Sequence, residues 1–216
     1  MGGIEQRIQY LIDNPVPFAI TAIITVVAIA LHEFGHAFMA VACGDPTPRA
    51  EGRLTLNPIA HLDPIGTIGI FFLGFGWGKP VMVQPSNFRN KRWDDMKVSI
   101  AGPAMNLFQA LIFAILLRTF LQMQLHDRAP VAMWIFERGM MINVGLMVFN
   151  LIPVGPLDGA TVIRAFLPPR TAYQFQAFNQ QYGMLLFLGL LMTGTVGYFI
   201  LPVQGIFERY ITWGLT

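Results

Sequence analysis

Two histidines and a glutamate stand together inside an apolar stretch of the chain. The motif His32-Glu33-Phe34-Gly35-His36 lies within residues 17–44, where the only further ionisable side chain is Cys43. Histidines at i and i+4 share one helix face, about 6 Å apart along the axis, so both can bind one metal ion. The glutamate between them can face the open coordination position and act as a general base instead of a ligand. The spacing predicts a metal centre that activates water.

The apolar surroundings of this motif argue for a function. The alternative is a chance HExxH sequence on an amphipathic helix with hydrogen-bonded histidines. An unpaired glutamate inside a membrane costs several kcal/mol, so ionisable side chains at that depth are functional candidates.

The composition places the whole chain in a lipid bilayer. Hydrophobic residues make up 54% of the 216 residues and charged residues 12%, about half the usual share of a globular protein. The net charge of +2 is small and the basic residues are dispersed, which argues against a nucleic-acid partner. No linker or charge run divides the sequence. We therefore expect a single membrane-embedded domain over residues 1–216.

Four long apolar stretches predict spanning helices, at about 16–43, 97–121, 131–152 and 183–205. Residues 65–77 are apolar but too short to span, and five glycines fall between residues 66 and 78. These glycines favour a re-entrant, β-hairpin-like segment at about 65–83, with a Gly-rich helix-packing segment as the alternative. The expected fold is an all-α polytopic membrane protein with about four spanning helices plus this short segment.

The distribution of basic residues predicts the orientation in the membrane. The loops at 44–97 and 156–183 hold nine Lys and Arg, and the opposite side holds five. Loops rich in Lys and Arg stay in the cytoplasm, so we expect both chain ends outside and the two larger loops inside. This orientation places the HExxH motif nearer the cytoplasmic face, and a bacterial inner membrane is the expected location.

A catalytic zinc site needs a third protein ligand and an open position for water. The acidic and histidine side chains outside the first span offer five candidates: His61, Asp63, His126, Asp127 and Asp158. The prolines and glycine at 153–156 end the third span, so Asp158 can turn inward at the depth of the motif, and a helix N-cap is its other possible role. His61 and Asp63 lie between prolines and are expected to be turn and cap residues. The other two fall on the opposite side of the membrane.

Three motifs in this order resemble the site-2 proteases, which are intramembrane zinc metalloproteases that cut transmembrane helices of other proteins. They are HEFGH at 32–36, AGPAMN at 101–106, and the run Asn150-x-x-Pro-x-x-Pro-Leu-Asp158-Gly. The segments RLTLNP at 53–58 and HLDPIG at 61–66 resemble a subgroup of compact members. The loop between the second and third spans is too short for a PDZ domain, and no nucleotide-sensing CBS module is expected after residue 205.

The resemblance implies one zinc ion bound by His32, His36 and Asp158. It also implies that Glu33 activates the zinc-bound water. Cleavage then takes place within or near transmembrane segments, the reaction known as regulated intramembrane proteolysis.

The resemblance further implies how the substrate is held. Asn150 is expected to hydrogen-bond the substrate backbone or the developing oxyanion. The region Gly74-Phe75-Gly76 resembles a membrane-inserted β-hairpin that presents an edge strand to the substrate. The roles of Asn57 and Asn106 stay open, because a polar helix-packing role suits Asn106 as well as a catalytic one.

The expected function is therefore that of an intramembrane zinc endopeptidase. Its partners would be a single-span membrane protein as substrate and the lipid bilayer, with the substrate's identity and the oligomeric state left open. One alternative is a membrane metal transporter, which has no need of a glutamate at the open coordination position and commonly shows repeated halves. The other is an inactive scaffold that binds membrane helices, against which the intact Glu33 and the complete ligand set argue.

Overall fold

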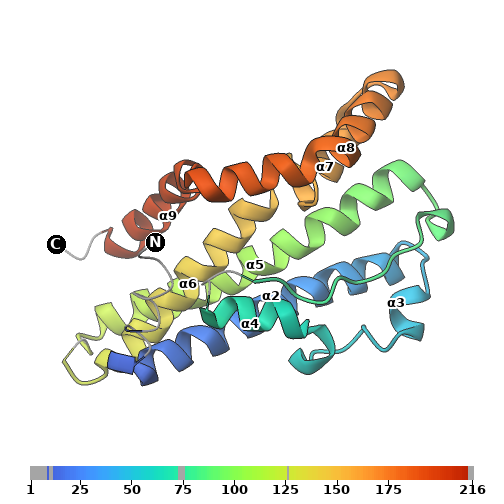
Figure 1. The fold of residues 1–216 in the computed structure, drawn as a ribbon. Coiled ribbons are helices and arrows are strands. Elements are labelled where there is room, and N and C mark those ends of the chain that lie inside the picture. The colour runs from blue at the N-terminus through green and yellow to red at the C-terminus, as the bar shows by residue number, and fades with distance from the viewer. Residues whose placement is uncertain (1–8, 10–11, 73–75, 126, 214–216) are drawn as a thin grey trace.

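The computed structural model describes residues 9, 12–72, 76–125 and 127–213. These residues form helices and irregular segments, and the β-structure among them is one isolated antiparallel bridge between Leu62 and Gly78. Figure 1 shows the arrangement. The longer helices are α2 (Pro15–Ala42), α5 (Lys91–Gln122), α6 (Pro130–Asn150), α8 (Pro169–Thr193) and α9 (Val196–Thr212). The shorter ones are α3 (Thr47–Ala50), η1 (Pro58–His61), α4 (Pro64–Phe72), η2 (Pro85–Asn87) and α7 (Asp158–Phe166).

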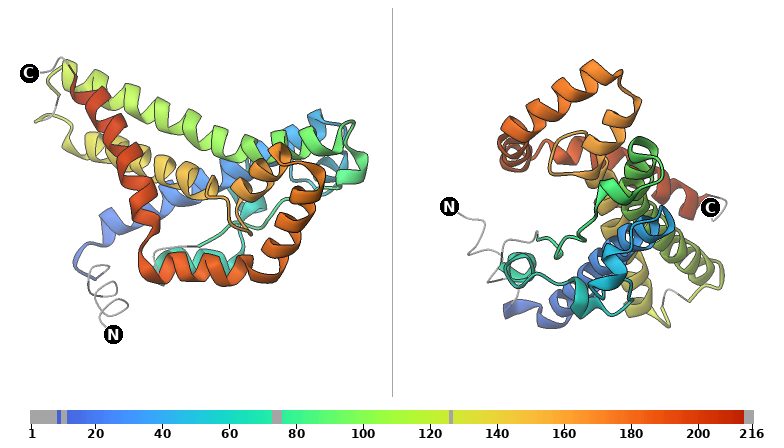
Figure 2. Two further views of the ribbon diagram at one scale, coloured as in Figure 1. Left: turned by 90° about the horizontal axis from the view of Figure 1, so that it is seen from above. Right: turned by 90° about the vertical axis from the view of Figure 1, so that its right-hand side faces the viewer.

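Helices α2, α5 and α6 pack side by side and form the centre of the molecule (Figures 1 and 2). Small side chains at their contacts are fully buried, among them Ala28 and Ala37 of α2 and Ala110 and Ala114 of α5. Small residues let helix backbones approach closely in a membrane, where packing and not water exclusion holds helices together. The site residues on α2 are therefore held against a tightly packed neighbour.

Three of the predicted spans are confirmed as long apolar helices. Helices α2, α5 and α6 are each long and apolar enough to cross a membrane, and the bent pair α8–α9 would make a fourth span if counted as one. Helix α5 begins six residues before the predicted start at 97. The side chain of Asn90 caps its first turn by accepting a hydrogen bond from the Trp93 N–H.

The fourth span, expected at about 183–205, is divided between two helices. Helix α8 begins at Pro169, and the chain bends by 66° between α8 and α9. The bend lies at Gly194, whose φ of 69° is the left-handed conformation that ends many helices. Hydropathy stays high across this point, so the apolar pattern alone gave no sign of the break.

The predicted β-hairpin-like segment at about 65–83 is not supported by the described residues. Helix α4 occupies Pro64–Phe72, and the Asp63 side chain caps it by accepting a 2.7 Å hydrogen bond from the Gly66 N–H. Residues 73–75 lie outside the described part of the chain. A Cβ at Gly66 would lie 2.1 Å from the Trp77 carbonyl oxygen, so this glycine allows residues 76–78 to pack against the helix. Gly66, Gly76 and Gly78 allow close packing, as in the alternative interpretation.

Helix α7 is fixed to α5 by two arginines. Arg92 of α5 donates from Nε to the Ala165 carbonyl at 2.7 Å and from Nη2 to the Leu167 carbonyl at 2.8 Å, at the end of α7 where carbonyls lack helical partners. Arg164 of α7 forms an ion pair with Asp95 of α5. These contacts set the position of α7, which begins at Asp158.

Candidate metal centre

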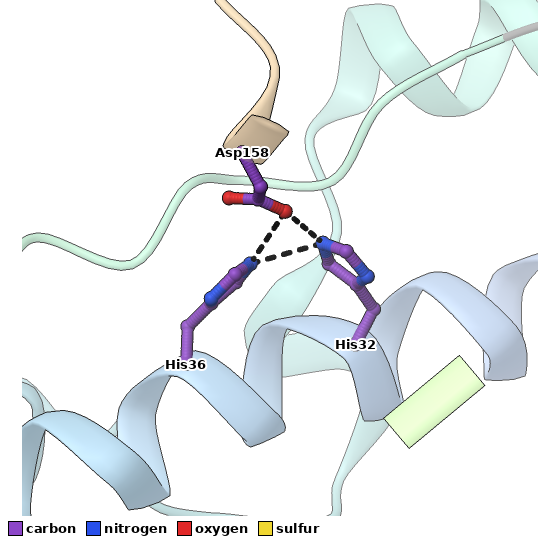
Figure 3. Close-up of side chains that lie close together, drawn as sticks. All are labelled: His32, His36 and Asp158. Carbon is purple, nitrogen blue, oxygen red and sulfur yellow. Dashed lines mark hydrogen bonds and ion pairs between the residues drawn. The ribbon is translucent and has the colours of Figure 1, made fainter. Parts of the chain in front are cut away.

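His32, His36 and Asp158 point toward one another, although Asp158 is more than 120 residues away in the sequence (Figure 3). The two Nε2 atoms lie 2.9 Å apart, and Oδ2 of Asp158 lies 3.3 Å from Nε2 of His32 and 3.4 Å from Nε2 of His36. Within the described residues, this is the group of three or more His, Cys, Asp and Glu side chains whose ligand atoms come close enough to hold a metal ion.

These residues fit a zinc ion in three respects. Tetrahedral zinc with nitrogen and oxygen ligands at about 2.0–2.1 Å places neighbouring ligand atoms about 3.3 Å apart, which matches the 3.3 and 3.4 Å from Asp158 to the two histidines, while the two Nε2 atoms lie closer, at 2.9 Å. Oδ2 of Asp158 is buried and has no hydrogen-bond partner, a costly state that a bound cation would relieve. A Cβ at Gly102 would lie 2.4 Å from Nε2 of His36, so the glycine keeps the space beside the ligand atoms open.

The charge of Asp158 suits a ligand to a cation. Burial raises the pKa of its carboxyl group, but hydrogen bonds and positive charge from protonated imidazoles of His32 and His36 lower the pKa to about 2. The carboxylate is therefore an anion at neutral pH, as metal binding requires.

The local sequence explains how Asp158 reaches the histidines. Helix α6 ends at Asn150, and residues 151–157 form turns that lead into α7 with Asp158 as its first residue. A Cβ at Gly159 would lie 2.2 Å from the Leu151 carbonyl oxygen, so only glycine lets this loop fold back on the end of α6. The structure thus turns Asp158 inward, as the Pro/Gly pattern predicted, and its side chain does not cap the helix.

Each histidine is held by its second ring nitrogen. Nδ1 of His32 lies 2.7 Å from Oδ1 of Asn106, and Nδ1 of His36 lies 2.7 Å from the Val98 carbonyl oxygen. Both partners are acceptors, so each Nδ1 carries a proton and each Nε2 is the nitrogen that a metal ion would bind.

Asn106 is itself fixed by a buried network. Its Nδ2 donates to Oδ1 of Asn143 at 3.0 Å and to the Ala28 carbonyl at 3.2 Å. Both asparagines are fully buried. Asn106 was identified from the sequence without a definite role. Asn143 was not identified, because the sequence marks it only as a polar residue within the third apolar span.

Glu33 lies outside the ligand cluster and faces another segment. Its Oε2 accepts a 3.1 Å hydrogen bond from the Val81 N–H. Its role as a general base stays a prediction.

The predicted substrate-binding residues are only partly described. Asn150 is the last residue of α6 and donates from Nδ2 to the Leu146 carbonyl at 2.9 Å. Gly74 and Phe75 lie outside the described residues. Gly76 packs against α4, since a Cβ there would lie 2.0 Å from the Gly66 carbonyl oxygen. Substrate contacts by these residues stay predictions.

The remaining candidates have other partners. His61 is fully buried and its Nε2 donates to the Thr55 carbonyl at 2.8 Å, while Asp63 caps α4. The Asn57 side chain accepts from the Ile59 N–H and caps η1. Asp127 does not belong to the cluster, and His126 lies outside the described residues.

The sequence is similar to several named proteins. It is 38% identical over 206 residues to YwhC of Bacillus subtilis, covering 91% of this chain and 90% of that protein. It is 34% identical over 173 residues to Rip2 of Mycolicibacterium smegmatis, covering 77% of this chain and 64% of the relative. Both carry provisional names as zinc metalloproteases. It is 22% identical over 163 residues to the zinc metalloprotease MJ0392 of Methanocaldococcus jannaschii, covering 76% of this chain and 39% of that protein.

No family model and no solved structure matches the sequence. The similarity to YwhC extends over nearly the full length of both chains, and the residues of the cluster provide the nitrogen and oxygen ligands that zinc prefers. The chain therefore belongs to the family of zinc metalloproteases that includes YwhC.

Proposed function

We propose that this protein is an intramembrane zinc endopeptidase of the site-2 type, which hydrolyses peptide bonds within or near transmembrane segments of other membrane proteins. The observation that carries the proposal is the position of the candidate metal centre. His32 and His36 lie on α2, which is long and apolar enough to span a membrane. A metalloprotease whose ligands lie on such a helix is placed to act at membrane depth.

In the proposed mechanism, His32, His36 and Asp158 hold one zinc ion. When bound, zinc polarises the scissile carbonyl and lowers the pKa of a bound water to about 7. Glu33 would accept a proton from the attacking water and return it to the amine that leaves. The bonds from His32 to Asn106 and from His36 to Val98 keep both imidazoles in the ligating tautomer throughout.

The substrate is proposed to bind as an extended strand. The carbonyl groups of a helix are hydrogen-bonded to amides four residues later, so a substrate helix must unwind before a peptide bond can be attacked. Asn150 lies at the end of α6, eight residues before Asp158, and its amide is the proposed partner for the substrate backbone or the oxyanion. The partner class is a single-span membrane protein.

The described part of the chain contains three or four candidate spans, which fits a multi-pass membrane protein, and the bacterial relatives point to an inner membrane. Residues 44–97, which include the first turns of α5, and residues 156–183 carry nine of the fourteen Lys and Arg, so we propose that these regions face the cytoplasm. The metal centre then lies toward the cytoplasmic side, since His36 precedes the end of α2 by only six residues. Water has a short path to it from that side.

The test is co-expression with a panel of single-span membrane proteins. We expect cleavage of at least one substrate by the wild-type chain and its loss in Glu33→Gln. A metal transporter would instead move zinc across vesicle membranes, and an inactive scaffold would bind a substrate helix and leave it intact. Either result, without cleavage of any substrate, would contradict the proposal.

A further inference from the structure

We infer that the segment of residues 78–84 orients Glu33 through the backbone N–H of Val81, and that Arg53 and Asp45 are positioning residues that hold this segment in place. The inference rests on the proposed role of Glu33 as general base. It assigns a part in catalysis to two buried charged residues that lie outside the metal centre.

The 78–84 segment runs along α2 between α4 and α5 (Figure 1). At its start, a Cβ on Gly78 would lie 2.8 Å from Cγ2 of Ile29 and 3.3 Å from Cγ of Glu33. Near its end, Val83 packs against the buried cluster that includes Ala40 and Cys43. The segment therefore follows the helix toward its C-terminal end and passes directly over the glutamate.

The Val81 N–H is the contact that reaches the catalytic motif. It donates to Oε2 of Glu33 at 3.1 Å. A carboxylate that takes a proton from water must be aligned with it, and a misplacement of about 1 Å can cost about a hundredfold in rate. A fixed backbone donor on one oxygen restrains the rotation of the side chain and leaves the other oxygen to accept the proton.

Arg53 anchors the segment ahead of Val81. The residue is 4% exposed, and its Nη2 donates to the Lys79 carbonyl oxygen. The N–H of Lys79 donates to the His61 carbonyl at 2.8 Å, so both backbone groups of this residue are engaged. Hydrogen bonds from a charged donor are about twice as strong as neutral ones, which makes Arg53 an effective anchor.

Asp45 anchors the segment behind Val81. The residue is fully buried, and its Oδ2 accepts a 2.6 Å hydrogen bond from the Gln84 N–H. Its other oxygen accepts from the Thr47 hydroxyl at 2.6 Å and from Nδ2 of Asn87 at 2.9 Å. Val81 therefore lies between two anchored positions, which fixes where its N–H points.

A pair of proline substitutions tests the contact with Glu33. Val81→Pro removes the N–H that reaches Glu33. Met82→Pro is the matched control, because Met82 is 62% exposed and its N–H has no backbone or side-chain partner among the described residues. We expect Val81→Pro to lower kcat about tenfold to a hundredfold, with KM and zinc content unchanged. Met82→Pro should keep kcat within about threefold, since no contact with the base is lost. Equal losses in the two variants, or a wild-type kcat in Val81→Pro, would overturn the inference.

Substitutions of Arg53 test the anchor. Arg53→Ala should lower kcat at least about tenfold while zinc stays bound, and Arg53→Lys should restore most of kcat because an ammonium group can still donate to the Lys79 carbonyl. Cys43 is the only cysteine and is buried, so its protection from maleimide checks the fold of each variant. If Cys43 becomes accessible to maleimide in Val81→Pro, the comparison of Arg53→Ala with Arg53→Lys decides whether the segment orients Glu33. A wild-type kcat in Arg53→Ala, or a loss of zinc that parallels the loss of kcat, would overturn the inference.

The same series includes Glu33→Gln. A fully active Glu33→Gln would refute the proposed general base itself. An inactive Glu33→Gln beside a fully active Val81→Pro would refute only the part assigned to the segment.

Discussion

Nδ1 of His32 lies 2.7 Å from Oδ1 of Asn106, and both residues are buried at the contact of α2 with α5. The asparagine oxygen accepts the ring proton, so the opposite nitrogen of His32 is free to bind a metal. The amide of Asn106 is held in turn by Asn143 and by the Ala28 carbonyl. A polar network of this kind inside three apolar helices is explained by the histidine that it orients.

Replacement of Asn106 should weaken zinc binding. In Asn106→Ala the His32 ring loses the acceptor that selects its tautomer, and losses of such partners typically cost about 10–100-fold in metal affinity. The dissociation constant is measured by competition with a chelator of known affinity. Gln109→Ala is the control, because Gln109 is a buried amide of the same helix whose side chain donates to its own helix, at the Met105 carbonyl. Equal affinities in wild type and Asn106→Ala would contradict this role.

A methyl group at Gly102 should close the metal site. The Cβ of Gly102→Ala would lie 2.4 Å from Nε2 of His36 and 2.6 Å from Nε2 of His32, closer than such contacts allow. Either the histidines or α5 must move, so we expect zinc content to fall well below one ion per chain. Gly189→Ala is the matched control in α8, where an added Cβ meets nothing within 4 Å. Full zinc content in Gly102→Ala would show that the site lies elsewhere.

Much of this centre was predictable from the sequence, because its residues lie at fixed spacings. The i, i+4 histidines need only a helix to come together, and the prolines and glycine before Asp158 indicated a broken helix end. The hydrogen bond between Val81 and Glu33 could not be predicted, since it joins a backbone group to a side chain 48 residues away. Asn143 was missed because one polar residue among several in this span, beside Glu137, Arg138 and Asn150, does not indicate its partner.

The third ligand can be distinguished by metal analysis. Asp158→Ala removes one of the three clustered ligand atoms and should lower zinc occupancy strongly. His61→Ala and Asp63→Ala should leave zinc per folded chain nearly intact, because these side chains bond to Thr55 and to Gly66 instead. Zinc that persists in Asp158→Ala but disappears in His61→Ala would reverse this assignment.

Asp45 should make the stability of the loop region depend on pH. Burial raises the pKa of its carboxyl group, but hydrogen bonds from Thr47, Asn87 and Gln84 outweigh burial and lower the pKa below its ordinary value. A lowered folded pKa stabilises the fold above the unfolded pKa of about 3.9, and this stabilisation disappears as pH falls through the folded pKa. Thermal unfolding should therefore show a larger difference between wild type and Asp45→Asn at pH 7 than at pH 3. A difference that is the same at both pH values would contradict this.

The parts of the fold that the sequence predicted poorly are those where a glycine decides the backbone. Hydropathy continues unbroken through Gly194, yet its left-handed conformation divides the last apolar stretch into α8 and α9. The glycines at 66 and 76 suggested an extended hairpin, whereas they allow α4 and the following residues to pack closely. Glycine permits both outcomes, so composition could not separate them. The spans α2, α5 and α6 were predictable because length and apolar character alone specify a membrane helix.

The most direct test of the account uses purified protein in lipid vesicles together with one single-span substrate. Zinc per chain and the rate of substrate cleavage are measured in the same samples of wild type and Glu33→Gln. We predict one zinc ion per chain in both, with cleavage by wild type that a chelator abolishes and zinc restores. Glu33→Gln should show a loss of at least about a hundredfold in rate, as expected on removal of a general base. Cleavage by zinc-loaded Glu33→Gln at the wild-type rate would contradict the central claim.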